Sequence, residues 1–201
     1  GLSKACSVVA SGTAPLSYQW SFNGSELADA TNASLLFAGL QASDAGDYTV
    51  TVSNAWGPVT SAVATLTVLV PPGITTPPQS QAVVRGQTPT FTVDASGTAP
   101  LSYQWRFNGS TLAGATNAAL SLSNVQSNQA GNYVVVVNNS VGSATSSVAV
   151  LTVYVPAGIA TQPQSQTTTQ GWSRTFFVVP NGTAPFSCQW SLNGANMTNE
   201  T

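Results

Sequence analysis

A period of 85 residues is the feature that most restricts what this chain can fold into. The ten residues SGTAPLSYQW occur at 11–20 and again, letter for letter, at 96–105, and the variant NGTAPFSCQW occupies 181–190. Residues 1–70 are identical to residues 86–155 at 40 of 70 aligned positions. Because the period holds over the whole chain, it predicts a tandem array of copies of one module.

Within one period the pattern is that of β-strands. Segments such as 133–137 and 148–155 are rich in β-branched and aromatic residues, which favour strands. Gly, Pro, Asn and Ser interrupt such segments about every 8–12 residues, the spacing of a β-sandwich or barrel. Three Asn-Gly pairs follow tryptophan-containing segments and favour tight hairpin turns: Asn23-Gly24, Asn108-Gly109 and Asn193-Gly194. No long apolar period of 3.6 residues occurs, so we expect an all-β fold with helices limited to single turns.

These residues resemble one family. The unit is similar to an immunoglobulin-like domain of the I-set type, in the disulfide-free form of bacterial secreted and surface proteins. Trp105 matches the core tryptophan of strand C, Phe91 stands where the family has its strand B cysteine, and Asp44 to Tyr48 match the tyrosine corner. The resemblance implies tandem immunoglobulin-like β-sandwiches with Greek-key antiparallel sheets. It also implies a structural core that contains these aromatic residues: Trp20, Trp105, Trp190, Tyr48, Tyr133, Phe91 and Phe176.

The phase of the period predicts three domains. Residues 1–70 form a repeat that lacks strand A, residues 71–155 a complete repeat, and residues 156–201 a partial repeat with strands A to C. We therefore expect the chain to be a window cut from a longer array. The joints, Pro71 to Ile74 and Pro156 to Ile159, contain proline, which restricts the backbone and makes a semi-rigid spacer.

The two cysteines predict no disulfide. Cys6 stands at the strand B cysteine position, but the partner position is occupied by Val50, and Cys188 lies in a different repeat. We expect both to be free thiols that pack as small hydrophobic side chains.

Composition excludes most chemistry. The chain has no His, 2 Cys and only 4 Lys and Arg, so it has neither a zinc ligand set nor a basic patch for nucleic acid. None of the four acidic residues of the first repeat is retained in the second, so no calcium site is repeated. Ser and Thr have no base to activate them. We therefore expect no enzyme activity, catalytic residue, metal or cofactor. No run of 18 apolar residues occurs, and we expect no membrane insertion.

Two tryptophans outside the predicted core are candidates for a binding surface. Trp56 lies in the turn between strands F and G, and Trp172 lies in the turn before strand B. The second repeat has Val141 and Gln87 at these positions. Two interpretations remain open, namely packing against the adjacent repeat or joint and an aromatic platform for a sugar or a protein.

The sequence leaves two functions open. The first is a non-catalytic structural segment, an extended stalk or fibre of a large secreted or surface protein, with assembly into an extracellular filament as a variant. Its partners are neighbouring immunoglobulin-like repeats of the same or identical chains, and its location is extracellular or at the cell surface. The alternative is an accessory module of a secreted enzyme or adhesin that binds glycans or surface proteins. A cell-adhesion receptor of the vertebrate type is disfavoured by the missing disulfides.

Overall fold

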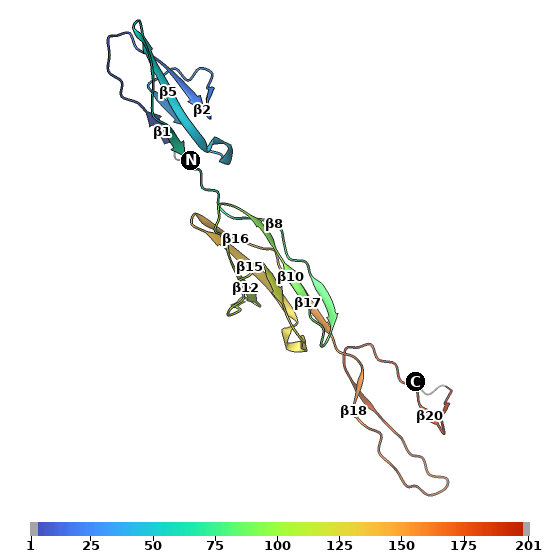
Figure 1. The fold of residues 1–201 in the computed structure, drawn as a ribbon. Helices are drawn as coiled ribbons and strands as arrows, with labels where there is room; N and C mark the ends of the chain where they lie inside the picture. The colour runs from blue at the N-terminus through green and yellow to red at the C-terminus, as the bar shows by residue number, and fades with distance from the viewer. Residues whose placement is uncertain (1–3, 199–201) are drawn as a thin grey trace. The chain divides into compact units, whose positions relative to one another are not determined.

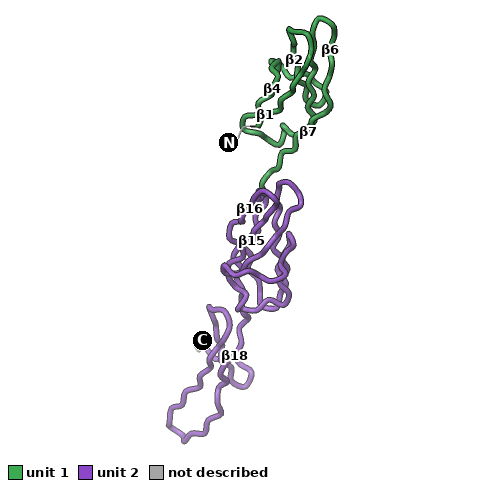
Figure 2. Tube along the Cα trace, turned by 90° about the vertical axis from the view of Figure 1, so that its left-hand side faces the viewer, with its two compact units in different colours: residues 1–71 green, residues 72–201 purple. Residues whose placement is uncertain are grey.

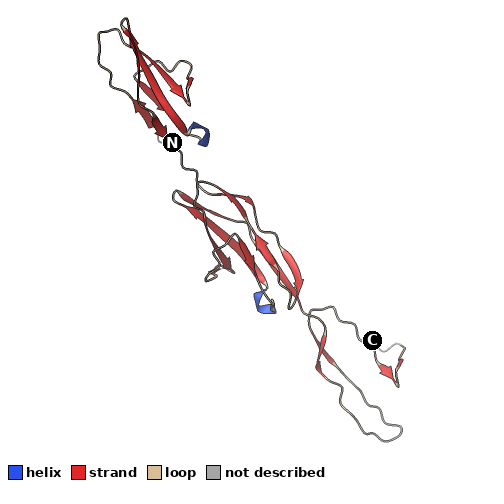
Figure 3. Cartoon of the chain, in the orientation of Figure 1, coloured by secondary structure: helices blue, strands red, loops and turns tan. Residues whose placement is uncertain are grey.

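The computed structural model describes residues 4–198, and its regular secondary structure consists almost entirely of β-strands (Figures 1 and 3). The helical elements of the described residues are two turns of 3-10 helix, η1 (Ala42–Asp44) and η2 (Ser127–Gln129). The prediction of tandem immunoglobulin-like β-sandwiches is confirmed. The chain divides into two compact units, Gly1–Pro71 and Pro72–Thr201, which Figure 2 colours separately. The second unit holds the second and third repeats.

The second repeat is a sandwich of two layers. One layer is a sheet with the strand order β13-β12-β15-β17-β9, in which β16 also pairs with β15, and the other layer consists of the pairs β10–β14 and β8–β11. The bounds of these strands are β8 (Gly73–Thr76), β9 (Gln81–Val84), β10 (Thr90–Thr92), β11 (Asp94–Ser96), β12 (Ser102–Phe107), β13 (Ser110–Thr111), β14 (Ala119–Ser121), β15 (Gly131–Asn139), β16 (Gly142–Thr145) and β17 (Ala149–Tyr154). Pairing is antiparallel except between β9 and β17, which are parallel. The sequence pattern did not predict this parallel pair.

The core of the second repeat lies between these layers. Alternate residues of β15 point inward, as the period of a strand requires, and Tyr133, Val135 and Val137 are at most 2% exposed. Trp105 on β12 pairs with Val135 and is fully buried. Phe91 on β10 is also fully buried and stacks on Tyr133 with 4.9 Å between the ring centroids. A buried phenylalanine contributes roughly 1.5–3 kcal/mol, so apolar packing replaces the disulfide at this position.

The first repeat has the same design with fewer strands. Its sheets have the orders β3-β2-β5-β6, with β7 paired to β5, and β1-β4. The bounds are β1 (Lys4–Ser7), β2 (Ser17–Phe22), β3 (Ser25–Glu26), β4 (Ser34–Phe37), β5 (Gly46–Asn54), β6 (Gly57–Thr60) and β7 (Ala64–Leu66). Trp20 and Tyr48 are 3% and 4% exposed and form the core with Val50 and Val52. Among the described residues this repeat has no counterpart of β8 or β9.

The third repeat is a set of short strand pairs. β18 (Gly158–Thr161) pairs with β19 (Val179–Asn181), and β20 (Ser191–Leu192) pairs with β21 (Ala195–Asn196). The expectation that Phe176 and Trp190 are core residues is wrong for this structure, since Phe176 is 52% exposed and Trp190 is only half-buried. The physical reason is that residues 156–198 contain no counterpart of β14 and β15, which in the second repeat pair with the strands of Phe91 and Trp105 and contribute Tyr133, Val135 and Val137 to the core around them.

Two hydrogen-bond patterns recur in the first two repeats and explain why the tyrosine corner tolerates the exchange of aspartate for glutamine. The tyrosine corner uses a backbone carbonyl, because Tyr48 Oη donates to the Asp44 carbonyl at 2.9 Å and Tyr133 Oη donates to the Gln129 carbonyl at 2.8 Å. The side chains of Asp44 and Gln129 each accept the backbone N–H three residues earlier. Both requirements are acceptor requirements, so glutamine replaces aspartate without losing a hydrogen bond.

The predicted hairpin turns are confirmed in all three repeats. Asn23, Asn108 and Asn193 have φ between 47° and 49°, and each following glycine has φ between 82° and 84°. Positive φ at both central residues is the type I′ turn that matches the twist of a hairpin. These turns connect β2 to β3, β12 to β13 and β20 to β21.

Candidate functional site

Trp56 lies on the turn between β5 and β6 and is 76% exposed. The turn is ordered by Asn54, whose Oδ1 accepts the Trp56 backbone N–H at 3.0 Å. The Asn54 Nδ2 donates to the Thr13 carbonyl at 3.0 Å and so ties this turn to the loop between β1 and β2. Trp56 therefore stands on a well-ordered turn at one end of the first repeat, with its ring in solvent.

Trp172 is the other tryptophan outside the predicted core, and it is 67% exposed. It lies in a turn of the third repeat, where its backbone N–H donates to the Thr169 carbonyl at 3.1 Å. The guanidinium carbon of Arg174 lies 5.9 Å from the centre of the Trp172 ring, within the range of a cation–π contact. Trp56 and Trp172 belong to different compact units, so the structure does not assemble them into one site.

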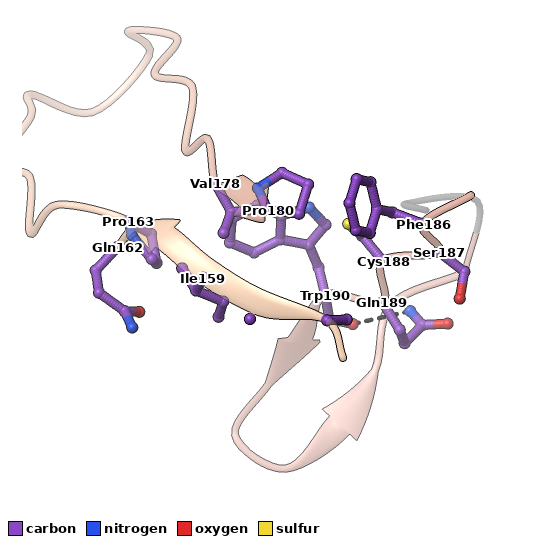
Figure 4. Close-up of a pocket in the computed structure, with 12 residues that line it drawn as sticks. Ile159, Gln162, Pro163, Val178, Pro180, Phe186, Ser187, Cys188, Gln189 and Trp190 are labelled. Atoms are coloured by element: carbon purple, nitrogen blue, oxygen red, sulfur yellow. Dashed lines mark hydrogen bonds between the residues drawn. The ribbon is translucent and has the colours of Figure 1, made fainter. Parts of the chain in front are cut away.

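An open hollow of about 340 Å³ lies in the third repeat (Figure 4). Its apolar walls include Ile159, Pro180, Phe186 and Trp190, and Cys188 also lines it. In the second repeat, the counterpart of Trp190 is Trp105, which is fully buried in a core cluster with Phe91 and residues of β15. The hollow therefore lies at positions that belong to the core in the second repeat, and its position alone does not define a ligand site.

A third feature is the loop Gly-Thr-Ala-Pro, here called the GTAP loop, which has the same four residues in all three repeats: Gly12–Pro15, Gly97–Pro100 and Gly182–Pro185. Its Ala-Pro peptide bond is cis in each repeat. In the third repeat the loop binds the end of the preceding strand, since Thr183 N donates to the Val155 carbonyl at 2.9 Å and Val155 N donates to Thr183 Oγ1 at 2.8 Å. Sequence reasoning missed this contact, although the exact recurrence of the four residues was its visible signal.

The titratable and metal-binding groups give no centre for chemistry. Burial raises the pKa of the Tyr48 and Tyr133 phenols above the usual value of 10.0, and the nearby Asp44 carboxylate and Cys6 raise the pKa of Tyr48 further. Both phenols are tied into the tyrosine corners described above. No group of three metal-ligating side chains occurs within residues 4–198, and Cys6 and Cys188 are free thiols. Within the same residues, no helix has the length and apolar character needed to cross a membrane.

Comparison with known proteins identifies relatives of this arrangement. Residues 71–139 match the immunoglobulin domain family. The chain is 32% identical over 160 residues to human Roundabout homolog 3, a match that covers 77% of this chain and 12% of that protein. It is 29% identical over 201 residues to the muscle M-line assembly protein unc-89 of Caenorhabditis elegans, covering 90% of this chain and 2% of that protein. Among solved structures, it is similar to an I-band fragment from titin, with a TM-score of 0.73 at 23% identity over 100% of this chain and 77% of the fragment.

The fold and these matches define the chain as a tandem of immunoglobulin-like domains, I-set-like in kind, which is similar in sequence to Roundabout homolog 3 and unc-89 and similar in fold to the titin fragment. This is a non-catalytic family, so the prediction that the chain is not an enzyme is confirmed. The relatives named here come from a human and a nematode, and they do not support the bacterial kind of repeat that the sequence suggested. The chain spans only 12% and 2% of the length of these two proteins.

Proposed function

We propose that the chain is a structural segment of a large secreted or surface protein, in which immunoglobulin-like repeats joined end to end hold other domains apart. The observation that carries this proposal is the joint at 155–158. Val155, directly after β17, is held by two hydrogen bonds to Thr183 of the next repeat. Proline follows at position 156 and removes both a donor and backbone freedom. A joint with these restraints is stiffer than a Gly/Ser linker.

The relatives support a structural role without defining one for this chain. The unc-89 protein is named for muscle M-line assembly, and the titin fragment, which is named for the I-band, shares the fold. An extracellular location, and assembly of chains side by side into a filament, are part of our proposal. Neighbouring repeats of the same or identical chains are then the partners.

Small-angle X-ray scattering of the full chain tests the spacer function. A compact globule of this length has a radius of gyration of about 17 Å. A nine-residue strand spans about 30 Å, so three repeats placed end to end are at least about 90 Å long and give a radius of gyration of about 26 Å or more. We expect the larger value, and Thr183→Val should broaden the distribution of dimensions. A value near that of the globule would refute the spacer function.

A second candidate function is an accessory module that binds glycans or surface proteins, and one observation favours it. Trp56 exposes 76% of its surface on an ordered turn, and exposed aromatic rings suit the apolar faces of sugars and protein partners. A glycan array probed with the full chain tests this function. Binding that is lost in Trp56→Ala but kept in Trp172→Ala would support it, and an array without any signal would leave the spacer function as the explanation.

A further inference from the structure

The outer face of one sheet differs between the first two repeats, although the core under that sheet does not. In the first repeat Tyr48, Val50 and Val52 of β5 are buried. The residues between them, Thr49 and Thr51, therefore lie on the opposite face of the strand, which is turned away from the other sheet. We call this face of the sheet the outer face, and the same definition applies to the sheet that contains β15 in the second repeat.

Valine replaces threonine on the outer face of the second repeat. Three positions are exchanged in this way: Thr49, Thr51 and Thr65 in the first repeat correspond to Val134, Val136 and Val150 in the second. Val150 is 42% exposed, and Val134 and Val136 are half-buried. Val150 lies opposite Asn132, two residues from Val134, so the valines are neighbours and form one apolar stripe. A contiguous apolar patch on a solvent-facing sheet indicates a contact surface.

The two outer faces also carry opposite charges. On the first repeat Glu26 and Asp47 are exposed, and the strand register places both on the outer face. On the second repeat Arg106 is exposed on the outer face, where it lies opposite Val134. The matching positions of the other repeat are uncharged: Thr111, Asn132 and Ser21. The outer face of the first repeat is thus acidic and polar, whereas that of the second repeat is basic and apolar.

The threonine face of the first repeat can be covered at a low cost in lost hydration. The hydroxyls of Thr51 and Thr60 form a hydrogen bond of 2.9 Å, and Thr65 Oγ1 donates to Asp47 Oδ1 at 2.7 Å. Because these hydroxyls have partners within the repeat, the removal of water does not leave them unsatisfied. The hydroxyl donor is uncharged, so Asp47 keeps its negative charge. The face therefore offers methyl groups for apolar contact and carboxylates for a cation.

We propose that the outer face of the first repeat in one copy of this chain binds the outer face of the second repeat in another copy. Arg106 of one copy then faces the acidic pair Glu26 and Asp47 of the other, and the valine stripe packs on the threonines. Sheets of β-sandwiches pack face to face in the same manner within a domain. Each copy carries both faces, so the contact can repeat from copy to copy. The inference rests on the side-by-side assembly in the proposed function, whereas the spacer function does not require it.

Charge favours this pairing over the pairing of like faces. Two first-repeat faces would bring four carboxylates onto one interface, and two second-repeat faces would bring both copies of Arg106 together. Like charges that are brought together at an interface are unfavourable, and opposite charges select the partner. Only 5% of the residues are charged, so few other charges compete with this selection.

The test follows association of the full chain by NMR over a series of dilutions at low salt, with sedimentation velocity to measure mass. We expect amide signals from both outer faces to shift with concentration, Thr49 and Thr51 on one and Val134 and Val136 on the other. The shifts should decrease at high salt, because salt screens exposed charges. Residue-specific signals also separate this contact from association through the hollow of the third repeat, which would shift the signal of Trp190 instead.

Variants that exchange residues between the repeats preserve the fold, because the other repeat already accommodates each new residue. Arg106→Ser should raise the dissociation constant about two- to fivefold, the effect of one exposed ion pair. Val134→Thr and Val136→Thr should each raise it about fourfold, since each removes about one methyl group from the contact. The matched control Leu36→Ser removes an exposed apolar side chain from β4 in the other sheet, and it should leave the dissociation constant unchanged.

Three results would overturn the proposal. The first is the absence of concentration-dependent shifts on the outer faces, and the second is a shift on one outer face alone, which indicates pairing of like faces. The third is an equal effect of Leu36→Ser and Arg106→Ser. The scattering test of the spacer function uses dilute, unassembled chains and does not depend on this contact, so the two proposals can fail separately.

Discussion

Two serines at equivalent positions make the same hydrogen bonds but differ in burial. They therefore allow a matched test of how burial changes the contribution of these hydrogen bonds to the free energy of unfolding. Ser146 Oγ accepts the Val135 N–H at 3.1 Å and donates to the Ser147 carbonyl at 2.8 Å. Ser61 Oγ makes the same two contacts, with Val50 at 3.1 Å and the next carbonyl at 2.8 Å. Ser146 is buried, at 9% exposed, whereas Ser61 is exposed.

Because the two serines have the same hydrogen-bond geometry, the loss of unfolding free energy on substitution by alanine should differ only because water reaches one site and not the other. In Ser146→Ala the amide of the fully buried Val135 loses its partner, and an unsatisfied buried donor costs about 1–3 kcal/mol of the free energy of unfolding. In Ser61→Ala water replaces the exposed hydroxyl, and the cost should be about 0.5 kcal/mol or less, as for most exposed substitutions. Urea titrations followed by the NMR signals of Val135 and Val50 report the two units separately. Equal losses of stability in the two units would refute this reasoning.

Three further predictions follow from the core and the titratable groups. Because burial raises the pKa of the Tyr48 and Tyr133 phenols, unfolding releases protons above about pH 10, and the free energy of unfolding should fall as pH rises from about 10 towards the folded pKa. Urea denaturation at about pH 9 and about pH 11 checks this, and Tyr133→Phe should weaken the fall. Trp105→Ala should cost about 3–5 kcal/mol through the cavity it leaves, whereas Trp56→Ala should change stability by less than about 0.5 kcal/mol; chemical denaturation distinguishes the two. Both cysteines should react with an alkylating reagent after unfolding without reductant, and an intact mass that lacks either label would contradict the free thiols.

Much of the fold follows from the sequence because its signals are local. A type I′ hairpin turn needs positive φ at two successive residues, and Asn-Gly is the pair that adopts this conformation most readily. The alternation of apolar residues along 131–139 places Tyr133, Val135 and Val137 on one face. The tyrosine corner was recognisable even with Gln129 in place of aspartate, since the hydrogen bond that defines it reaches a backbone carbonyl.

What the sequence did not reveal depends on pairing between distant segments. The parallel pair β9–β17 joins residues about 70 positions apart, as Leu151 lies opposite Gln81. Nothing in the sequence of either strand indicates that the two strands pair, or that they run parallel. The hydrogen bond between Val155 and Thr183 also joins distant segments. No local feature of a threonine in a loop indicates which residue it will bind. Only the exact recurrence of the GTAP loop in three repeats indicated that the loop has a shared task.

The third repeat shows why residue identity does not determine burial on its own. Phe176 and Trp190 stand at the positions of Phe91 and Trp105. Phe176 is 52% exposed and Trp190 is half-buried, whereas Phe91 and Trp105 are fully buried. Burial of an aromatic ring in a sandwich requires the facing sheet, because the apolar face of one sheet is shielded from water only when a second layer packs against it. A motif in the sequence therefore predicts which side of a strand is apolar, and the strands present in the same repeat decide whether that side becomes a core or an open hollow.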